Sequence, residues 1–232
     1  MGRPRIALLN ASYEVEDTRR NFMREVDASL VEYVLTEGDI PTELDTDGAI
    51  VTGSKASVYW DEAWIDRTAD LVRTVVDDGL PVLGVCWGHQ LLAHALGGEV
   101  RDMGEYEIGY RPIDHVDDDG LLASLPPRFT AFTTHSDQVV ELPSGTTEVA
   151  RNDASIQGFA GEHVWGVQFH PEYDMATART VTEAKDDLDP TTKERALASI
   201  TEETYRDAGA AKRVFDAFVD RVEDRSPRAT RV

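Results

Sequence analysis

Short apolar runs separated by helical patterns are the feature that most restricts the fold of this 232-residue chain. Residues 5–9, 48–52 and 81–85 are mainly apolar, which is typical of strands buried on both faces of a parallel sheet. Between these runs, residues 19–36 and 61–78 place apolar side chains at helical spacing and end near glycines. This alternation of strand and helix predicts a doubly wound α/β sheet.

The second half of the chain follows a different pattern. After a helix predicted over residues 88–96, short strand candidates follow one another closely and indicate a smaller antiparallel portion. These strand candidates are residues 108–113, 128–134, 138–142, 148–151, 156–160 and 164–168. From Met175 the sequence becomes helical, with one break at Asp189-Pro190. We therefore predict one domain over residues 1–175, with residues 176–232 forming a C-terminal helical extension packed on it.

The charge balance excludes several classes of partner. With 23 Lys and Arg against 44 Asp and Glu, the formal charge is −21, which repels phosphate backbones and anionic lipid. No stretch approaches the roughly 18 consecutive apolar residues that a membrane span requires. We therefore predict no nucleic-acid and no membrane partner. The apolar stretch at residues 6–9 is too short for a signal peptide, so we expect a cytoplasmic protein.

The cations are unevenly divided between lysine and arginine. Only Lys55, Lys185, Lys193 and Lys212 are lysines, and acidic clusters recur, for example at residues 117–119. This composition favours a halophilic protein, because concentrated salt screens the self-repulsion of a large net charge. An ordinary soluble acidic protein remains the alternative.

The segment Gly84-Val85-Cys86-Trp87-Gly88 follows an apolar strand and opens a helix, as a nucleophile elbow does. The flanking glycines remove Cβ atoms that would clash in such a sharp turn. The helix N-terminus favours a thiolate, and the backbone N–H of Trp87 is placed to donate to an oxyanion. We therefore interpret Cys86 as a nucleophile rather than as a small buried core residue.

A cysteine nucleophile needs a base, and the base needs an orienting group. His170-Pro171-Glu172 follows a predicted strand, so His170 should emerge at the sheet edge where α/β active sites lie. Pro171 biases His170 toward an extended conformation, which projects residues 170 and 172 to the same side. Glu172 would then accept a hydrogen bond from one imidazole nitrogen while the other faces the sulfur.

These two motifs together resemble the class I glutamine amidotransferase family over about residues 5–175. G-V-C-W-G-H-Q starts at Gly84 and G-V-Q-F-H-P-E-Y starts at Gly166, in the family's order of Cys, His and Glu. The likeness extends to free-standing members related to the amidotransferase half of GMP synthase, and residues 107–110 (E-I-G-Y) strengthen it. The resemblance implies a flavodoxin-like, mostly parallel sheet with the triad at its carboxyl edge.

The resemblance also implies a role for each matching position. The implied site residues are the catalytic Cys86, His170 and Glu172, the oxyanion donors Gly53 and Trp87, and the substrate contacts Gln90, His135 and Ser136. Where the family's glycine loop often reads Gly-Gly-Pro, this chain has Gly53-Ser54-Lys55.

The activity implied by the resemblance is hydrolysis of the glutamine side-chain amide to glutamate and ammonia through a thioester. Family members usually pass the ammonia to an ATP-using synthetase, which a separate partner chain would have to supply. Two alternatives stay open: a γ-glutamyl peptidase with the same triad, and a catalytically silent scaffold or regulatory partner. The C-terminal helices would either cover the sheet or form a homodimer or synthetase-docking surface.

Other motifs carry no chemistry. Residues 48–55 resemble a P-loop, but Lys55 follows Ser54 instead of preceding it. His89 and His94 are five residues apart and miss the spacing of paired metal ligands. A single cysteine excludes an intramolecular disulfide and a cysteine metal cluster. We therefore predict no metal and no cofactor.

Overall fold

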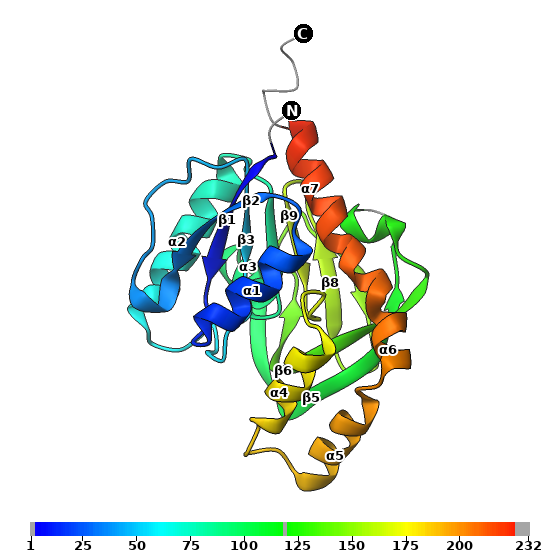
Figure 1. Cartoon of the computed structure of the whole chain (residues 1–232). Coiled ribbons are helices and arrows are strands. Elements are labelled where there is room, and N and C mark those ends of the chain that lie inside the picture. Colours follow the sequence, from blue (N-terminus) through cyan, green and yellow to red (C-terminus); the bar gives the residue numbers. More distant parts are fainter. Residues whose placement is uncertain (1–2, 118–119, 226–232) are drawn as a thin grey trace.

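One twisted sheet organises the part of the chain that the computed structural model describes, residues 3–117 and 120–225 (Figure 1). Within these residues, nine strands pair in the order β2-β1-β3-β4-β9-β8-β7-β5-β6. The strands are β1 (Arg5–Asn10), β2 (Ser29–Val34), β3 (Gly48–Val51), β4 (Val82–Val85), β5 (Glu99–His115), β6 (Arg128–Glu141), β7 (Thr147–Arg151), β8 (Ile156–Ala160) and β9 (Val164–Val167).

The helices are distributed along the whole chain. They are α1 (Val15–Glu25), α2 (Ala63–Asp77), α3 (Trp87–Ala95), α4 (Met175–Glu183), α5 (Pro190–Ser199), α6 (Glu202–Asp207) and α7 (Arg213–Arg225). Short 3₁₀ turns add η1 (Leu35–Glu37), η2 (Gly120–Ser124) and η3 (Ala208–Lys212).

The sheet divides into a parallel half and an antiparallel half. Strands β2, β1, β3, β4 and β9 pair in parallel. Strands β8, β7, β5 and β6 are added antiparallel beyond β9. This confirms the predicted flavodoxin-like, doubly wound α/β fold with an antiparallel portion.

The helix predicted over residues 19–36 is wrong in its second half. Helix α1 ends at Glu25, and the chain then returns as strand β2, which pairs with β1 from Arg5↔Ser29 onward. A run as short as Ser-Leu-Val-Glu-Tyr-Val fits helical spacing as well as alternation. Its β-branched and aromatic side chains and the open edge of β1 decide for the strand.

Other boundaries differ in length rather than in kind. The strands predicted over residues 128–134 and 138–142 are one long strand, β6, and residues 108–113 lie inside the longer β5. The predicted break at Asp189-Pro190 is a helix start, because the Asp189 carboxylate accepts hydrogen bonds from the first backbone N–H groups of α5. After α5, the expected helical stretch is interrupted between α6 and α7 by η3.

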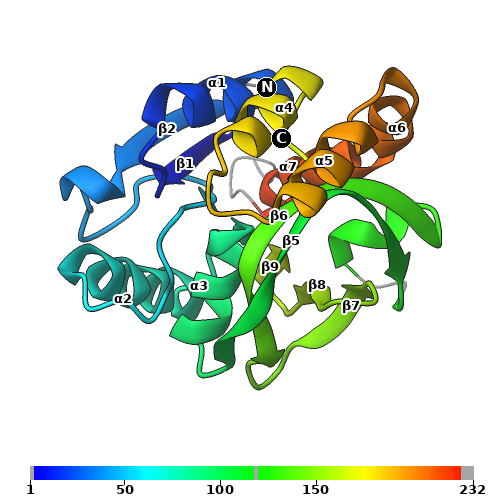
Figure 2. The same cartoon turned by 90° about the horizontal axis from the view of Figure 1, so that it is seen from below.

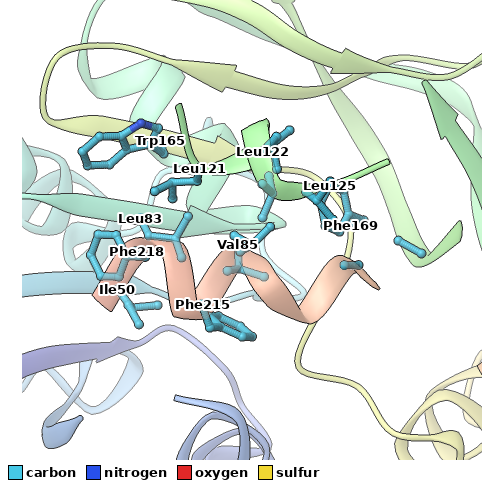
Figure 3. Packing of buried hydrophobic residues seen from close by; sticks show 14 of the residues in the cluster. Ile50, Leu83, Val85, Leu121, Leu122, Leu125, Trp165, Phe169, Phe215 and Phe218 are labelled. Atoms are coloured by element: carbon cyan, nitrogen blue, oxygen red, sulfur yellow. The ribbon is translucent and has the colours of Figure 1, made fainter. Parts of the chain in front are cut away.

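The two faces of the parallel half are covered by different helices, as a doubly wound fold requires. On one face, α1 and α7 pack on Ile6, Leu8 and Ile50, whereas α2 and α3 pack on the other. Figure 3 shows Phe215 and Phe218 of α7 against the sheet, with Trp165 and Phe169 nearby. A third cluster joins α4 and α5 to β5 and β6, and Figure 2 shows these helices beside those strands.

Several sequence predictions remain outside what the structure tests. The division at residue 175 stays a prediction, although α7 contributes apolar side chains to the core cluster of the sheet. Residues 118–119 of the acidic run and residues 226–232 of the extension lie outside the described residues. Over the described ranges, none of the helices has the length and apolar character needed to cross a membrane.

Candidate active site

Cys86 lies at the strained turn between β4 and α3. Its φ of 55° makes it the one non-glycine residue with positive φ in the described part of the chain. A Cβ at Gly84 would lie 2.4 Å from backbone atoms of Gly88, and a Cβ at Gly88 would lie 2.2 Å from the carbonyl oxygen of Val51. Both glycines are therefore required for the turn, as the sequence predicted.

His170 and Glu172 follow strand β9 and face one another. The Nδ1–H of His170 donates to Oε1 of Glu172 at 2.8 Å, and both side chains are buried. The backbone N–H of His170 donates to the carbonyl oxygen of Phe132 at 2.8 Å, which ties this loop to β6. The ring of Tyr173 stacks on the imidazole at 4.2 Å. Within the described structure, Nε2 of His170 is buried without a hydrogen-bond partner.

The electrostatics of this group favour a charged imidazole. Burial alone would lower the pKa of His170, but the negative charges of Cys86 and Glu172 outweigh burial and raise that pKa to about 10. The protonated form of His170 is therefore stabilised by an anionic sulfur and a carboxylate. Such a group can give a proton to a leaving nitrogen.

The backbone of Gly53 lies close to Cys86 and His170. A Cβ at this position would lie 3.1 Å from Cε1 of His170 and 3.9 Å from Sγ of Cys86. Trp87 is the first residue of α3, so its N–H lacks an acceptor one turn back in the helix. Its indole is buried and packs on Trp64 with ring centroids 5.2 Å apart.

Gln90, His135 and Ser136 lie behind the site rather than on its surface. None of the three lines the catalytic cavity. Nε2 of Gln90 donates to the carbonyl oxygen of Asp137 at 3.0 Å, and Nδ1 of His135 lies 2.8 Å from the same oxygen. Ser136 is half-buried within β6. Their role as substrate contacts stays a prediction.

A buried carboxylate that the sequence analysis did not assign holds His135. Oε2 of Glu107 lies 2.8 Å from Nε2 of His135, and Nδ2 of Asn152 donates to Oε1 at 2.6 Å. Burial would raise the pKa of Glu107, but the hydrogen bond and charge of His135 and the donor Asn152 lower it overall. Both ring nitrogens of His135 therefore face an oxygen atom, the carbonyl oxygen of Asp137 and the carboxylate of Glu107.

Cys86, His170 and Gly53 open into a cavity of about 370 Å³. It is lined at the carboxyl ends of the parallel strands, where α/β proteins bind ligands, and then extends between α1 and α4. The sequence analysis missed several lining residues: Ser12, Tyr106, Thr134, Tyr173, Thr177 and Lys185. Tyr173 could have been found from the sequence, because it directly follows the His-Pro-Glu motif. Lys185 could have been singled out because the chain contains only four lysines. The described residues contain no group of three or more His, Cys, Asp or Glu side chains arranged for a metal ion.

Comparison with protein families gives one matching description. The family model described as "Glutamine amidotransferase class-I" matches residues 12–185. A GMP synthase (glutamine-hydrolysing) from Thermomicrobium roseum is 41% identical over 130 residues, which are 56% of this chain and 24% of that protein. The chain thus corresponds to about a quarter of the length of that relative.

A shorter relative and two solved structures complete the comparison. A subunit of GMP synthase (glutamine-hydrolysing) from Sulfolobus acidocaldarius is 36% identical over 129 residues, 54% of this chain and 67% of that protein. A glutamine amidotransferase from Thermotoga maritima has a TM-score of 0.80 at 24% identity, covering 95% of this chain and 100% of that one. One from Methylobacillus flagellatus has the same TM-score of 0.80 at 21% identity, covering 95% of each chain. At these identities, the two structures support the fold alone.

Proposed function

Since this chain belongs to the class I glutamine amidotransferase family, we propose that it hydrolyses the side-chain amide of glutamine to glutamate and ammonia. The observation that carries the proposal is the arrangement around Cys86. A positive-φ cysteine at a strand-to-helix turn lies against Gly53 and a buried, carboxylate-paired His170. A silent scaffold has no need for a strained cysteine or for an unpartnered buried imidazole nitrogen, both of which cost stability.

In the proposed mechanism, the Cys86 thiolate attacks the amide carbon of glutamine. The N–H groups of Gly53 and Trp87 donate to the oxyanion that forms. His170 gives a proton to the departing nitrogen, the C–N bond breaks, and a γ-glutamyl thioester and ammonia result. His170 then takes a proton from water, which attacks the thioester and releases glutamate. Glu172 keeps the imidazole oriented and stabilises its charge.

Gln90, His135 and Ser136 complete the proposal as residues of the substrate side. Gln90 and His135 both contact the carbonyl oxygen of Asp137, and Thr134 at the head of this segment lines the cavity. The carbonyl oxygen of Thr134 is also 3.8 Å from Sγ of Cys86. These contacts support a role for Gln90 and His135 in holding the segment of β6 that contains Thr134 at a fixed distance from Cys86.

We further propose that the ammonia passes to an ATP-using synthetase on a separate chain. The names of the relatives support this, because one of them is a single subunit of a glutamine-hydrolysing GMP synthase. A homodimer remains a further prediction, and so does a cytoplasmic location.

The test is glutaminase activity of the purified chain, measured as glutamate release across a range of KCl concentrations, because its charge of −21 predicts adaptation to salt. A glutamine-like diazoketone should abolish the activity and label Cys86. Cys86→Ala is expected to be inactive, whereas Ser57→Ala, in the loop between β3 and α2 and not lining the cavity, should retain activity. An unlabelled Cys86 together with no glutamate release at any salt concentration would contradict the proposal.

A further inference from the structure

The imidazole of His170 performs two opposite steps in the proposed mechanism, so its ring must keep one orientation. It gives a proton to the departing nitrogen and later takes one from water. The hydrogen bond from Nδ1 to Oε1 of Glu172, 2.8 Å long, holds one edge of the ring. Nε2 lacks a hydrogen-bond partner among the described residues. A single contact in the ring plane leaves the ring able to turn about that contact, so a contact on its face is needed to fix the plane.

Tyr173 provides this contact. Its ring centroid lies 4.2 Å from that of the His170 imidazole, with 20° between the two planes, which is a stacked arrangement. Tyr173 is half-buried and lines the catalytic cavity together with His170. A cation over the face of an aromatic ring, within about 6 Å of its centroid, is attracted by the negative face of that ring. The stack therefore favours the protonated form of His170 as well as one orientation of its plane.

The ring of Tyr173 is itself held by Phe132 of β6. The centroids of these two rings are 5.8 Å apart, and Phe132 packs edge-on against Tyr110 of β5 at 5.3 Å. The carbonyl oxygen of Phe132 also accepts the hydrogen bond from the backbone N–H of His170 at 2.8 Å. Phe132 thus fixes both the backbone of His170 and the ring that stacks on its imidazole.

Helices α4 and α5 complete the support of this ring. Tyr173 packs on a buried apolar cluster that joins these helices to β5 and β6 (Figure 2). The buried members of the cluster are Ile108, Phe132, Ala178, Ala196 and Ile200. Residues of the C-terminal helices are thus connected to the catalytic base through one side chain, a role beyond covering the sheet.

The charges around His170 set the background against which the stack acts. Among the described residues, the charged groups that face it are Sγ of Cys86, at the turn before α3, and the carboxylate of Glu172, on its own segment. The loop after β3 contributes only the backbone of Gly53 near Cε1 of His170. Replacing the ring of Tyr173 leaves both negative charges in place, so the contribution of the stack can be measured separately.

We propose that Tyr173 is a positioning residue of the reaction, whose ring holds the plane of the His170 imidazole beside Cys86 and stabilises the imidazolium. Helices α4 and α5 act on catalysis by holding this ring, without contacting the substrate. The inference rests on the proposed function, since the imidazolium is the group that gives a proton to the leaving nitrogen. Loss of the stack lowers the pKa of His170 and removes the proton donor at alkaline pH.

The experiment compares the wild type with Tyr173→Phe, Tyr173→Leu and Tyr205→Leu. Phenylalanine keeps the aromatic face, whereas leucine keeps an apolar cover without a π face. Tyr205→Leu is the matched control, because it removes a ring on α6 that contacts Lys212 and does not line the cavity. NMR of protein with isotope-labelled histidine follows each imidazole through a pH titration, and a His170→Gln sample identifies the His170 signal.

We expect His170 of the wild type and of Tyr205→Leu to titrate with a pKa of about 10. In Tyr173→Leu this pKa should be lower by about one pH unit, the size of a desolvated cation–π contact. In Tyr173→Phe it should stay within about 0.3 units of the wild type, because the aromatic face is retained. The alkaline limb of the kcat profile for glutamine should move with it, since that limb reports loss of the imidazolium proton in the enzyme–substrate complex.

Two results would overturn the inference. One is an unchanged titration of His170 in Tyr173→Leu, even with a lower kcat, because a ring with a merely structural role would not affect this pKa. The other is an equal shift in Tyr173→Phe, which would assign the effect to the hydroxyl instead of the ring face. If Tyr173→Leu does not fold, Tyr173→Met is measured in its place and read in the same way. Because the titration needs no turnover, a wild type that releases no glutamate would contradict the proposed function separately from this result.

Discussion

The nucleophile side of the cavity and its α4 side hold their residues in different ways. At Cys86 the backbone decides the geometry, because Gly84 and Gly88 leave no space for any side chain. At Lys185 the geometry depends on side-chain contacts, namely the Tyr106 ring and the hydrogen bond from Lys193 to the backbone carbonyl of Lys185. Adding a single Cβ atom at Gly84 or Gly88 would force the whole turn at Cys86 to shift. Removing one contact of Lys185 would weaken its placement only in part, because the other contact remains.

This contrast separates the groups around Cys86 from the more distant lining of the cavity. A nucleophile, a base and an oxyanion site must keep their distances to a fraction of an ångström, so they gain from a packed sheet edge. Side chains that line the far end of the cavity, on and after α4, can change by single substitutions without disturbing the sheet. Helix α4 and its N-cap residue contact α1 through polar side chains, Thr177 with Asn21 and Asp174 with Arg24.

The largest expected effect is on the nucleophile side, from Glu172→Gln. The amide keeps the size of the side chain but removes the charge that stabilises protonated His170. We expect kcat to fall by about 10³–10⁴ while the fold is retained, as for comparable carboxylate-to-amide changes in catalytic triads. Steady-state kinetics with glutamine measure this effect. Glu203→Gln, at an exposed position on α6, is the control, and a loss below tenfold at Glu172 would contradict the account.

Next in size is the effect of Gly88→Ala on stability. The new Cβ would lie 2.2 Å from the carbonyl oxygen of Val51, so the elbow or β3 must shift. We expect the free energy of unfolding to fall by about 3 kcal/mol or more. Gly209→Ala is the matched control, because no atom lies within 4 Å of its Cβ position. Denaturant unfolding of both variants measures this difference. Equal free energies of unfolding for Gly88→Ala and Gly209→Ala would show that the turn at Cys86 accommodates a side chain and would contradict the account.

A smaller effect concerns the pH dependence of folding through His89, which is buried on α3. Burial lowers its pKa to about 3, whereas the unfolded chain titrates near its ordinary value of 6.5. As pH falls below 6.5, the unfolded state gains a proton that the folded state does not accept, so stability is lost progressively toward pH 3. Between pH 6.5 and 5 this loss is about 1.6 kcal/mol.

His89→Gln should remove that part of the pH dependence, measured as the free energy of unfolding at several pH values. His94→Gln, at an exposed position on the same helix, should leave it unchanged. The same slope in His89→Gln as in the wild type would show that this histidine is not held neutral.

The smallest effect is expected on the α4 side, from Lys193→Met. This variant removes the hydrogen bonds from Nζ to the carbonyl oxygens of Glu183 and Lys185 at the end of α4. Its cost to global stability should be about 0.5–1.5 kcal/mol, with faster hydrogen exchange confined to the end of α4. If Lys193→Met lowered the free energy of unfolding as much as Gly88→Ala does, the contrast between the nucleophile side and the α4 side of the cavity would be wrong.

The sequence predicted the nucleophile side well because each residue there is required by local backbone geometry. A cysteine between two glycines, after an apolar strand and before a helix, has few structures open to it. Strands β1, β3 and β4 were predicted for a similar reason, since burial on both faces leaves an uninterrupted apolar run. Strand β9 was predicted as a strand of the antiparallel portion, but it pairs in parallel with β4.

Features that depend on contacts between distant segments were not predictable from local patterns. Strand β2 was assigned to a helix because its six residues fit both periods, and only pairing with β1 decides between them. Lys185, two residues after the end of α4, contacts Tyr106 on β5, across about 80 residues of chain. Glu107 was missed as a site residue because its partners His135, Asn152 and Gln157 converge only when three strands and a loop assemble.

The central claim, that Cys86 carries the γ-glutamyl group, can be measured directly. Wild-type protein mixed with glutamine and quenched in acid within a turnover should show the added mass of a γ-glutamyl group on the peptide that contains Cys86. The account predicts this adduct in the wild type, a longer-lived adduct in variants that slow water attack, and none in Cys86→Ala. Glutamate formation without any adduct on Cys86, or at an undiminished rate in Cys86→Ala, would contradict it.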